Sequence, residues 1–311
     1  MSTKEGEEGW RYWLMALRQR SRALTWVLVL LLLAVPVSEP LLHAEEERLR
    51  PIDDLNTILM ENTFRLEGKG KGGVVTGTVF LIGNQRGDKP DLRIVLVTAA
   101  HVLADISEDF ATLHLRQKTE GNEWTRVPFA LPIKNKGEPL WTKHPKADIA
   151  VMYVRLPSAA VSAISRHLDT SLLADDDMLR RYEIHPGDTL YSLGYPLGFE
   201  SNGEGFPILR SGTIASYPLI PTNKTKTFMM DFEVFGGNSG GPVYFVDHNR
   251  TYNQATHLGQ TNRFILGVLI QQVQTSQIVR ELFPERTQQY PVKLAVVVHA
   301  SLLKETISLL P

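Results

Sequence analysis

The stretch "FGGNSGGPV", from Phe235 to Val243, decides how this chain is interpreted. A single serine, Ser239, stands among four glycines and an asparagine, and a proline–valine pair leads out of the cluster. Such a stretch is either a flexible glycine turn or a backbone shaped around a reactive hydroxyl, because glycine tolerates unusual φ and ψ angles. Apolar strand-like segments flank it on both sides, and Pro242 begins the second of them. These neighbours favour a tight, ordered loop.

Short β-branched and aliphatic runs dominate the chain after residue 60 and predict an all-β fold, either a sandwich or a pair of barrels. Alternation in "TLHLRQ" predicts a half-buried strand with Leu113 and Leu115 inward and His114 and Arg116 outward. Helical patterns are clear in two places only, at 159–168 and at 300–310. The predicted strands are "TFRLEG", "GVVTGTVFLIG", "RIVLVTAA", "TLHLRQ", "ADIAVMYVRL", "DTLYSLGYP", "SGTIASYPL", "KTFMMDFEV", "FILGVLIQQVQ" and "KLAVVVHA".

A strand-poor connector divides the predicted strands into two sets of similar size. It spans residues 156–186 and holds a helical segment, the acidic "ADDD" and "IHPGD". We therefore expect a first strand-rich half over 45–155 and a second strand-rich half, with the terminal helix, over 187–311. No internal repeat and no further binding module is expected.

Composition excludes several classes of function. The formal net charge of −1 gives no electrostatic footprint for nucleic acid. The sequence has no cysteine, which rules out disulfides, thiol catalysis and thiolate metal sites but leaves the redox compartment open.

Residues 1–44 have the pattern of a secretory signal. Three arginines precede an apolar run from Ala23 to Val35, and Ala44 stands before three glutamates. The run is short for a membrane-spanning helix, which needs about 20 apolar residues. We expect an exported protein, periplasmic or secreted. The alternative is an uncleaved membrane anchor over residues 23–37, because Leu42 is a poor residue three places before a cleavage at Ala44.

A reactive serine needs partners elsewhere in the chain. The hydroxyl requires a base within hydrogen-bond reach, and an imidazole base requires a carboxylate that fixes its tautomer. His101, in "IVLVTAAHVLAD", follows a strongly apolar strand and two small alanines. Asp148, in "KADIAVMYVRL", stands at the entrance to another apolar strand, where a charge is costly unless a partner bonds to it.

Each of these residues also has an ordinary structural interpretation. His101 alone fits a hydrogen-bonded core histidine, and Asp148 alone fits an aspartate that caps a turn. Asp105 is a rival carboxylate, four residues after His101 and on the same helical face, although "ADISED" around it is more solvated.

Taken together, "VTAAH", "DIAV" and "GNSGGPV" resemble the chymotrypsin-like serine peptidases, and among these the cysteine-free bacterial branch with HtrA-like and glutamyl-endopeptidase-like enzymes. The order His, Asp, Ser agrees, with spacings of 47 (148 − 101) and 91 (239 − 148) residues. The similarity extends over roughly residues 60 to 311 through "TGTVFLI", "YSLGYPLG", "SGTIAS" and "LGVLIQQ".

The resemblance implies two antiparallel six-stranded β-barrels with the active site between them and a C-terminal helix. It implies that His101 is general base and then general acid, that Asp148 orients the imidazole, and that Ser239 attacks a peptide carbonyl. The N–H groups of Gly237 and Ser239 would form the oxyanion hole. A polypeptide is then the substrate, and neither a metal nor an organic cofactor is expected.

Two features near Ser239 bear on activation and specificity. Trypsin-like zymogens carry an aspartate at the position of Asn238, which pairs with a newly cut α-amino group. An amide cannot make that ion pair, so activity is expected not to depend on N-terminal trimming. Glu233 lies where pancreatic-type enzymes place the base of the primary pocket and would favour Lys or Arg. The alternative is a solvated strand glutamate.

The resemblance also suggests how a peptide would bind. Leu269, Ile270, Gln271 and Gln272 match the strand that pairs with the substrate backbone, which implies β-augmentation. The polar insertion at 245–263 either shapes specificity or is a surface excursion. HtrA-like relatives often carry a PDZ domain and form trimers, but no PDZ domain is expected here and the sequence leaves the oligomeric state open.

A second hypothesis comes from another class of function. A protease-like fold can bind a peptide or partner without cleaving it. Degenerate members of such families usually lose one of the three residues, and this chain has all three.

Overall fold

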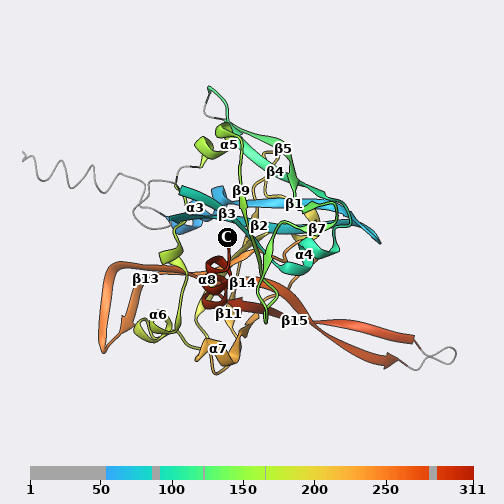
Figure 1. The fold of residues 1–311 in the computed structure, drawn as a ribbon. Helices are drawn as coiled ribbons and strands as arrows, with labels where there is room; N and C mark the ends of the chain where they lie inside the picture. The colour runs from blue at the N-terminus through green and yellow to red at the C-terminus, as the bar shows by residue number, and fades with distance from the viewer. Residues whose placement is uncertain (1–53, 86–91, 122, 165, 280–285) are drawn as a thin grey trace, which may run out of the picture. The chain divides into compact units, whose positions relative to one another are not determined.

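The computed structural model of this chain describes residues 54–85, 92–121, 123–164, 166–279 and 286–311. The predicted signal or anchor segment at 1–44 lies outside the described residues. The strands form two sets that are joined by a connector with short helices, which confirms the all-β class (Figure 1).

The first set is an antiparallel sheet with the strand order β5-β4-β1-β2-β3-β9-β8. Seven strands are hydrogen-bonded here instead of the expected six, because the two residues of β8 pair with Ala150 and Val151 of β9. The strands are β1 (Thr63–Gly70), β2 (Gly73–Gln85), β3 (Leu92–Thr98), β4 (Phe110–Lys118), β5 (Trp124–Pro132), β8 (Thr142–Lys143) and β9 (Ala150–Val154), with a separate pair of β6 (Lys134–Asn135) and β7 (Glu138–Pro139).

The second set is a closed antiparallel barrel of six strands, with the order β10-β11-β12-β15-β14-β13. Closure pairs β10 with both β11 and β13, so no edge strand remains in the barrel itself. Its strands are β10 (Thr189–Gly194), β11 (Ile208–Ile214), β12 (Thr227–Asp231), β13 (Pro242–Tyr252), β14 (Ala255–Val279) and β15 (Arg286–His299).

The helices agree with the sequence pattern at the C-terminus but not elsewhere. The terminal helix is α8 (Ala300–Ser308), close to the predicted 300–310. The helix predicted over 159–168 is shorter, because Ile164 adopts an extended conformation after α5 (Ser158–Ala163). The remaining helical elements are α4 (Ala100–Asp105), η1 (Thr170–Leu172), α6 (Asp176–Arg181), η2 (Pro196–Gly198) and α7 (Thr222–Thr225).

Helix α3 (Leu55–Asn62) was not predicted, yet its local signals are ordinary. The Asp54 side chain accepts a hydrogen bond from the Asn56 N–H at 3.1 Å and caps the helix. Leu55, Ile58 and Leu59 share the buried face, with the i, i+3, i+4 spacing of an amphipathic helix. The segment before the first strand is therefore part of the core.

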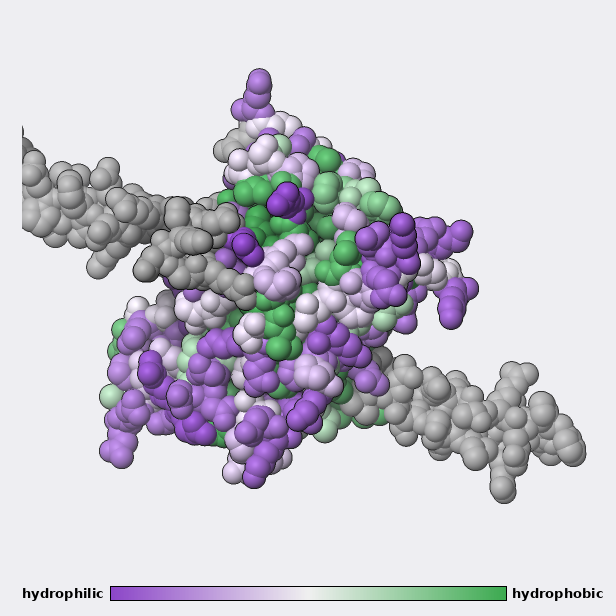
Figure 2. All heavy atoms as spheres, viewed as in Figure 1, coloured by the Kyte–Doolittle hydropathy of each residue, from purple (hydrophilic) through white to green (hydrophobic). Residues whose placement is uncertain are grey.

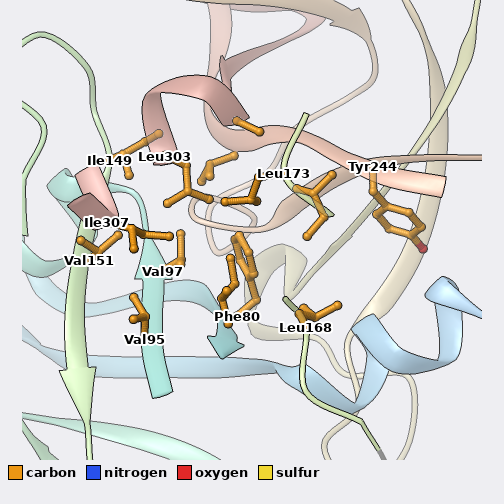
Figure 3. Packing of buried hydrophobic residues seen from close by; sticks show 14 of the residues in the cluster. Phe80, Val95, Val97, Ile149, Val151, Leu168, Leu173, Tyr244, Leu303 and Ile307 are labelled. Carbon is orange, nitrogen blue, oxygen red and sulfur yellow. The ribbon is translucent and has the colours of Figure 1, made fainter. Parts of the chain in front are cut away.

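One apolar cluster connects both strand sets with α3 and α8. Figure 3 shows side chains from β2, β3 and β9 pointing toward those of α8, with Tyr244 of the barrel beside them. A fully buried side chain of this size contributes about 1.5–3 kcal/mol relative to exposure. This packing fixes the two strand sets against each other, and its members include Phe80, Val95, Val97, Ile149, Val151, Leu168, Leu173, Tyr244, Leu303 and Ile307.

The predicted outward position of Arg116 is wrong. Leu113 and Leu115 are buried as predicted, but Arg116 is only 1% exposed. Its guanidinium lies 4.4 Å from the ring centre of Phe64 and 4.3 Å from that of Phe206. The loop that carries Phe206 covers the face of β4 on which Arg116 lies. Both faces of the strand are therefore buried at this point, and the alternation does not separate a buried face from an exposed one.

Strands β13, β14 and β15 run beyond the barrel as two hairpins. The first contains the predicted insertion at 245–263, where β13 pairs with β14 as far as Tyr252↔Ala255. It turns at Asn253 and Gln254, both in the left-handed region. The second pairs β14 with β15 from Gln274↔Pro291 to Val279↔Arg286 and projects from the barrel in Figure 1.

The surface on the face drawn in Figure 2 is mixed. Hydrophilic side chains cover most of the half that carries α6 and α7, and apolar side chains gather in the other half. Within the described ranges, no helix has the length and apolar character needed to cross a membrane.

Candidate active site

His101 and Asp148 lie next to each other at one end of the first sheet, where β3 ends and the neighbouring β9 begins. His101 is the second residue of α4, directly after β3, and Asp148 precedes β9. Strands β3 and β9 pair antiparallel up to Thr98↔Ala150, so residues 47 positions apart become neighbours. The His101 Nδ1 atom lies 2.5 Å from Oδ2 of Asp148, and the His101 backbone N–H donates to Oδ1 at 3.0 Å.

The carboxyl group of Asp148 is held in its charged form. Partial burial alone would raise its pKa, but the hydrogen bonds from the His101 ring and backbone outweigh burial and hold the pKa below its usual value. Asp148 is therefore an anion at neutral pH. An anion that accepts from Nδ1–H leaves Nε2 of a neutral His101 free to take a proton.

Ser239 lies in the loop between β12 and β13 and is bound to the first sheet through its backbone. The Ser239 carbonyl accepts from the Thr78 N–H at 2.8 Å. A Cβ at Gly240 would lie 2.1 Å from the Thr78 carbonyl oxygen and 3.1 Å from the Ala99 nitrogen. Since Ala99 caps α4, the serine loop contacts the start of the helix that carries His101.

The hydroxyl of Ser239 is not bonded to the histidine. It donates to the Ile270 carbonyl at 3.2 Å, and within the described chain no hydrogen bond joins it to His101. Catalytic hydrogen bonds are often long or misaligned in unliganded proteins and form in the substrate complex. A proton transfer from Ser239 to His101 would require a rotation about χ1 of Ser239.

The peptide groups around Ser239 are oriented by hydrogen bonds to their carbonyls. The Gly236 carbonyl accepts from the Leu197 N–H at 2.6 Å, and the Asn238 carbonyl accepts from the Gly241 N–H at 3.1 Å. In a planar trans peptide the N–H points opposite to the C=O. The N–H groups of Gly237 and Ser239 therefore point away from the donors Leu197 and Gly241, and no described residue accepts from either N–H. They can receive an oxyanion.

The backbone of Gly237 leaves no room for a side chain. Its φ is +95°, and a Cβ there would lie 2.1 Å from the Tyr195 carbonyl oxygen. Both the left-handed φ and the close approach of Tyr195 require glycine.

Asn238 is buried beside this loop without a partner for its amide nitrogen. Its side chain is 3% exposed, and Nδ2 has no hydrogen-bond partner among the described residues. The independence from N-terminal trimming stays a prediction, because residues 1–53 lie outside the described chain.

Glu233 is half-buried between β12 and the serine loop, and no described residue forms an ion pair with its carboxylate. Its carbonyl accepts from Arg210 at 2.6 Å. The Arg210 guanidinium lies 4.4 Å from the ring centre of Phe232. A cation is thus bonded to the backbone of the residue predicted to form the pocket, and no local sequence pattern indicates this contact.

The strand predicted to bind the substrate is hydrogen-bonded along one edge and partly free along the other. Leu269 pairs with Val297 of β15, while its N–H and carbonyl bond to the backbone of Gly241 and Gly240. From Gln271 onward, β14 pairs with β15 alone, as in Gln271↔Val296 and Gln272↔Ala295. Among the described strands nothing covers its other edge, so an extended peptide can add there.

The rival Asp105 does not join the site. It ends α4 and lines a separate cavity of about 590 Å³ with Lys134 and the turn at Gly70–Val75. No cluster of three His, Asp or Glu side chains suited to a metal occurs in the described part of the chain.

Two residues of the site were missed from the sequence. Thr78 bonds to the serine loop, and Leu197 presents its N–H to Gly236 from a left-handed conformation with φ of 54°. Their motifs, "TGTVFLI" and "YSLGYPLG", indicate only a similarity to the family. A threonine in a strand and a leucine in a turn carry no chemical signal of their own.

The sequence was also compared with known protein families and curated proteins. The family model described as "Trypsin-like peptidase domain" matches residues 75–250, more than half of the chain. A comparison with curated proteins returned no match.

A search of solved structures returned serine proteases at low sequence identity. A serine endoprotease from Yersinia pestis is 12% identical with a TM-score of 0.42, and the alignment covers 81% of this chain but only 63% of that chain. The protease Anisep from Arthrobacter nicotinovorans is 14% identical with a TM-score of 0.40, covering 80% and 94% of the two chains. An inactivated protease paralogue of the scabies mite is 14% identical with a TM-score of 0.43, covering 80% and 93%.

Proposed function

Because the chain belongs to the family of trypsin-like peptidase domains, we propose that it is an exported serine endopeptidase that hydrolyses peptide bonds in proteins. The observation that carries the proposal is the pairing of His101 with Asp148 next to the loop of Ser239. No metal or organic cofactor is part of the proposal.

The proposed reaction begins with proton transfer. His101 Nε2 takes the hydroxyl proton of Ser239 as the oxygen attacks the peptide carbonyl, and Asp148 stabilises the imidazolium that forms. His101 then gives this proton to the leaving amine. Water repeats the sequence in reverse and releases the acyl group from Ser239.

The negatively charged oxygen of the tetrahedral intermediate would accept hydrogen bonds from the N–H groups of Gly237 and Ser239. Their orientation by bonds to the Gly236 and Asn238 carbonyls supports this role, because a preorganised donor does not have to reorient during the reaction.

The substrate would bind as an extended strand along the free edge of β14, at Gln271 and Gln272. Leu269 and Ile270 belong to the same strand, but their backbone groups bond to the serine loop. They therefore hold the strand in place and do not bind the substrate backbone. Main-chain hydrogen bonds of this kind favour unfolded or looped segments of a protein over helices.

For specificity, we propose that Glu233 attracts Lys or Arg side chains of the substrate. The positive charge of Arg210 opposes this attraction, because its guanidinium is held at the Glu233 backbone carbonyl. Profiling of cleaved sites in a peptide library shows whether the negative charge of Glu233 or the positive charge of Arg210 determines the preference. Cleavage after basic residues that weakens in Glu233→Gln supports the proposal, and an absence of basic preference in the wild-type protein contradicts it.

We also propose that residues 1–44 direct export, as a cleaved signal or as an anchor at 23–37. A fusion of residues 1–44 to a reporter enzyme that is active only outside the cytoplasm tests this. Activity of the fusion is expected, and a reporter that stays inactive with an intact fusion protein would contradict export.

The second candidate is a binding module that does not cleave. The observation in its favour is the Ser239 hydroxyl bonded to Ile270 instead of His101. Incubation with a proteome-derived peptide library, read by mass spectrometry, separates the candidates. New peptide termini with the wild-type protein and none with Ser239→Ala support the peptidase. Peptide retention by folded protein without new termini supports the binding module.

A further inference from the structure

The serine loop receives one side-chain hydrogen bond from outside itself. Among the described residues, the backbone of the stretch from Gly236 to Gly240 is bonded otherwise only to backbone groups. The exception is the Thr78 hydroxyl, which donates to the Gly237 carbonyl at 2.7 Å. Thr78 lies on β2 of the first sheet, whereas the loop belongs to the second barrel.

The hydroxyl of Thr78 connects three segments of the chain. Its oxygen also accepts from the Tyr195 N–H at 3.3 Å, at the end of β10. The Thr78 backbone adds two more contacts, since its N–H donates to the Ser239 carbonyl at 2.8 Å and its carbonyl accepts from the Thr98 hydroxyl at 2.8 Å. Thr78 is fully buried. A hydroxyl that donates once and accepts once here is satisfied without water.

The peptide that contains the Gly237 carbonyl is held at its other side by the Asn238 N–H, which donates to the Phe235 carbonyl at 3.1 Å. This peptide lies between the two proposed oxyanion donors, the N–H groups of Gly237 and Ser239. Rotation of this peptide changes the angle between them. The neighbouring Asn238 side chain gives no support through its amide nitrogen, which has no partner among the described residues.

We propose that Thr78 is a positioning residue whose hydroxyl sets the orientation of the Gly237–Asn238 peptide and thereby of both oxyanion donors. This rests on the proposed peptidase function. Thr78 does not touch the substrate; it acts through the Gly237 carbonyl. The first strand set therefore contributes to transition-state stabilisation through Thr78 as well as through His101 and Asp148.

The test compares Thr78→Val, which keeps the shape and loses the hydroxyl, with Thr78→Ser, which keeps the hydroxyl. Both are assayed for kcat and KM on a peptide substrate and for inhibition by a peptide boronate, which mimics the tetrahedral anion. Thr78→Val is expected to lower kcat and boronate affinity by about 10- to 100-fold, since misplaced donors act only in the transition state. KM should change little, and Thr78→Ser should stay near wild type.

The matched control is Thr306→Val in α8, which also removes a buried hydroxyl bonded to a carbonyl, that of Leu302 at 2.6 Å. It should lose stability without losing boronate affinity. If Thr78→Val does not fold, the pair Thr78→Ala and Thr78→Ser carries the same comparison.

An active wild-type protein whose Thr78→Val variant keeps full kcat and boronate affinity would overturn the positioning role alone. The same holds if Thr78→Ser fails to rescue or if Thr306→Val loses as much kcat. A folded wild-type protein without any activity would overturn the proposed function, and the positioning role with it.

Discussion

Asp148 holds His101 by two bonds at once. One carboxylate oxygen lies 2.5 Å from Nδ1 of the ring, and the other accepts the backbone N–H of the same residue at 3.0 Å. The ring and the start of α4 are thus fixed by one side chain. This arrangement predicts that the role of Asp148 is orientation and charge, and that shape alone cannot replace it.

Asp148→Asn should therefore lower kcat strongly while the fold persists. An amide can still accept from the backbone N–H, but it favours the wrong histidine tautomer, which costs about 10⁴-fold in comparable sites. Steady-state kinetics and thermal melting measure the two effects. A kcat within tenfold of wild type would contradict the assigned role.

Gly237→Ala should abolish most of the activity. The new Cβ would meet the Tyr195 carbonyl, and the loop must shift, which removes oxyanion donors worth about 10²–10³ in rate. Gly187→Ala is the matched control, because Gly187 has a similar φ of +94° with nothing nearby. Both variants should lose roughly 1 kcal/mol from backbone strain. Equal kcat in the two variants would show that the Gly237 loop is not part of the chemistry.

Arg116→Met should destabilise the protein by about 3 kcal/mol or more, since buried polar partners are left without a donor. The guanidinium lies within hydrogen-bond distance of the Tyr195 hydroxyl and of four carbonyls, those of Met60, Glu61, Thr63 and Gly205. Denaturant unfolding measures the loss. The control Arg180→Met removes an exposed arginine with ion pairs and should cost less than about 1 kcal/mol. A similar small loss for Arg116→Met would contradict its role in fixing the loop.

His299 should make the fold sensitive to mild acid. Burial lowers the pKa of His299 to about 4, so between pH 6.5 and 4 the unfolded chain binds a proton that the folded chain does not. The contribution of neutral His299 to the free energy of unfolding is fully present above pH 6.5 and is lost toward pH 4, by up to about 3 kcal/mol. His299→Leu should reduce the drop in unfolding free energy between pH 7 and 4.5, whereas replacing the exposed His185 by Gln should not. An equal drop in all three proteins would contradict this.

The three candidate triad residues could be selected from the sequence because their motifs are local. His101 follows an apolar strand, whereas Asp148 and Ser239 precede one, and in each case the sequence shows both the strand and the polar residue. The structure brings His101 and Asp148 into contact and the serine loop against the start of α4.

What could not be predicted depends on contacts between distant segments. Arg116 alternates with apolar residues like a solvent-facing position, and it is buried by contacts with distant segments, among them Phe64 and the loop from Tyr195 to Phe206. Thr78 is one of several threonines in strands, and its role depends on Gly237, 159 positions away. Helix α3 could not be predicted for another reason. Its cap and apolar spacing are present in the sequence, but the helix has only eight residues.

The most direct test of the central claim is labelling with a fluorophosphonate probe, with the modified residue identified by mass spectrometry. An activated serine should be labelled at Ser239 close to one probe per molecule in the wild-type protein. Labelling should be lost in Ser239→Ala and in His101→Ala, with the fold of each variant checked by circular dichroism. Folded wild-type protein that takes up no probe, or that is labelled equally in His101→Ala, would contradict the peptidase mechanism.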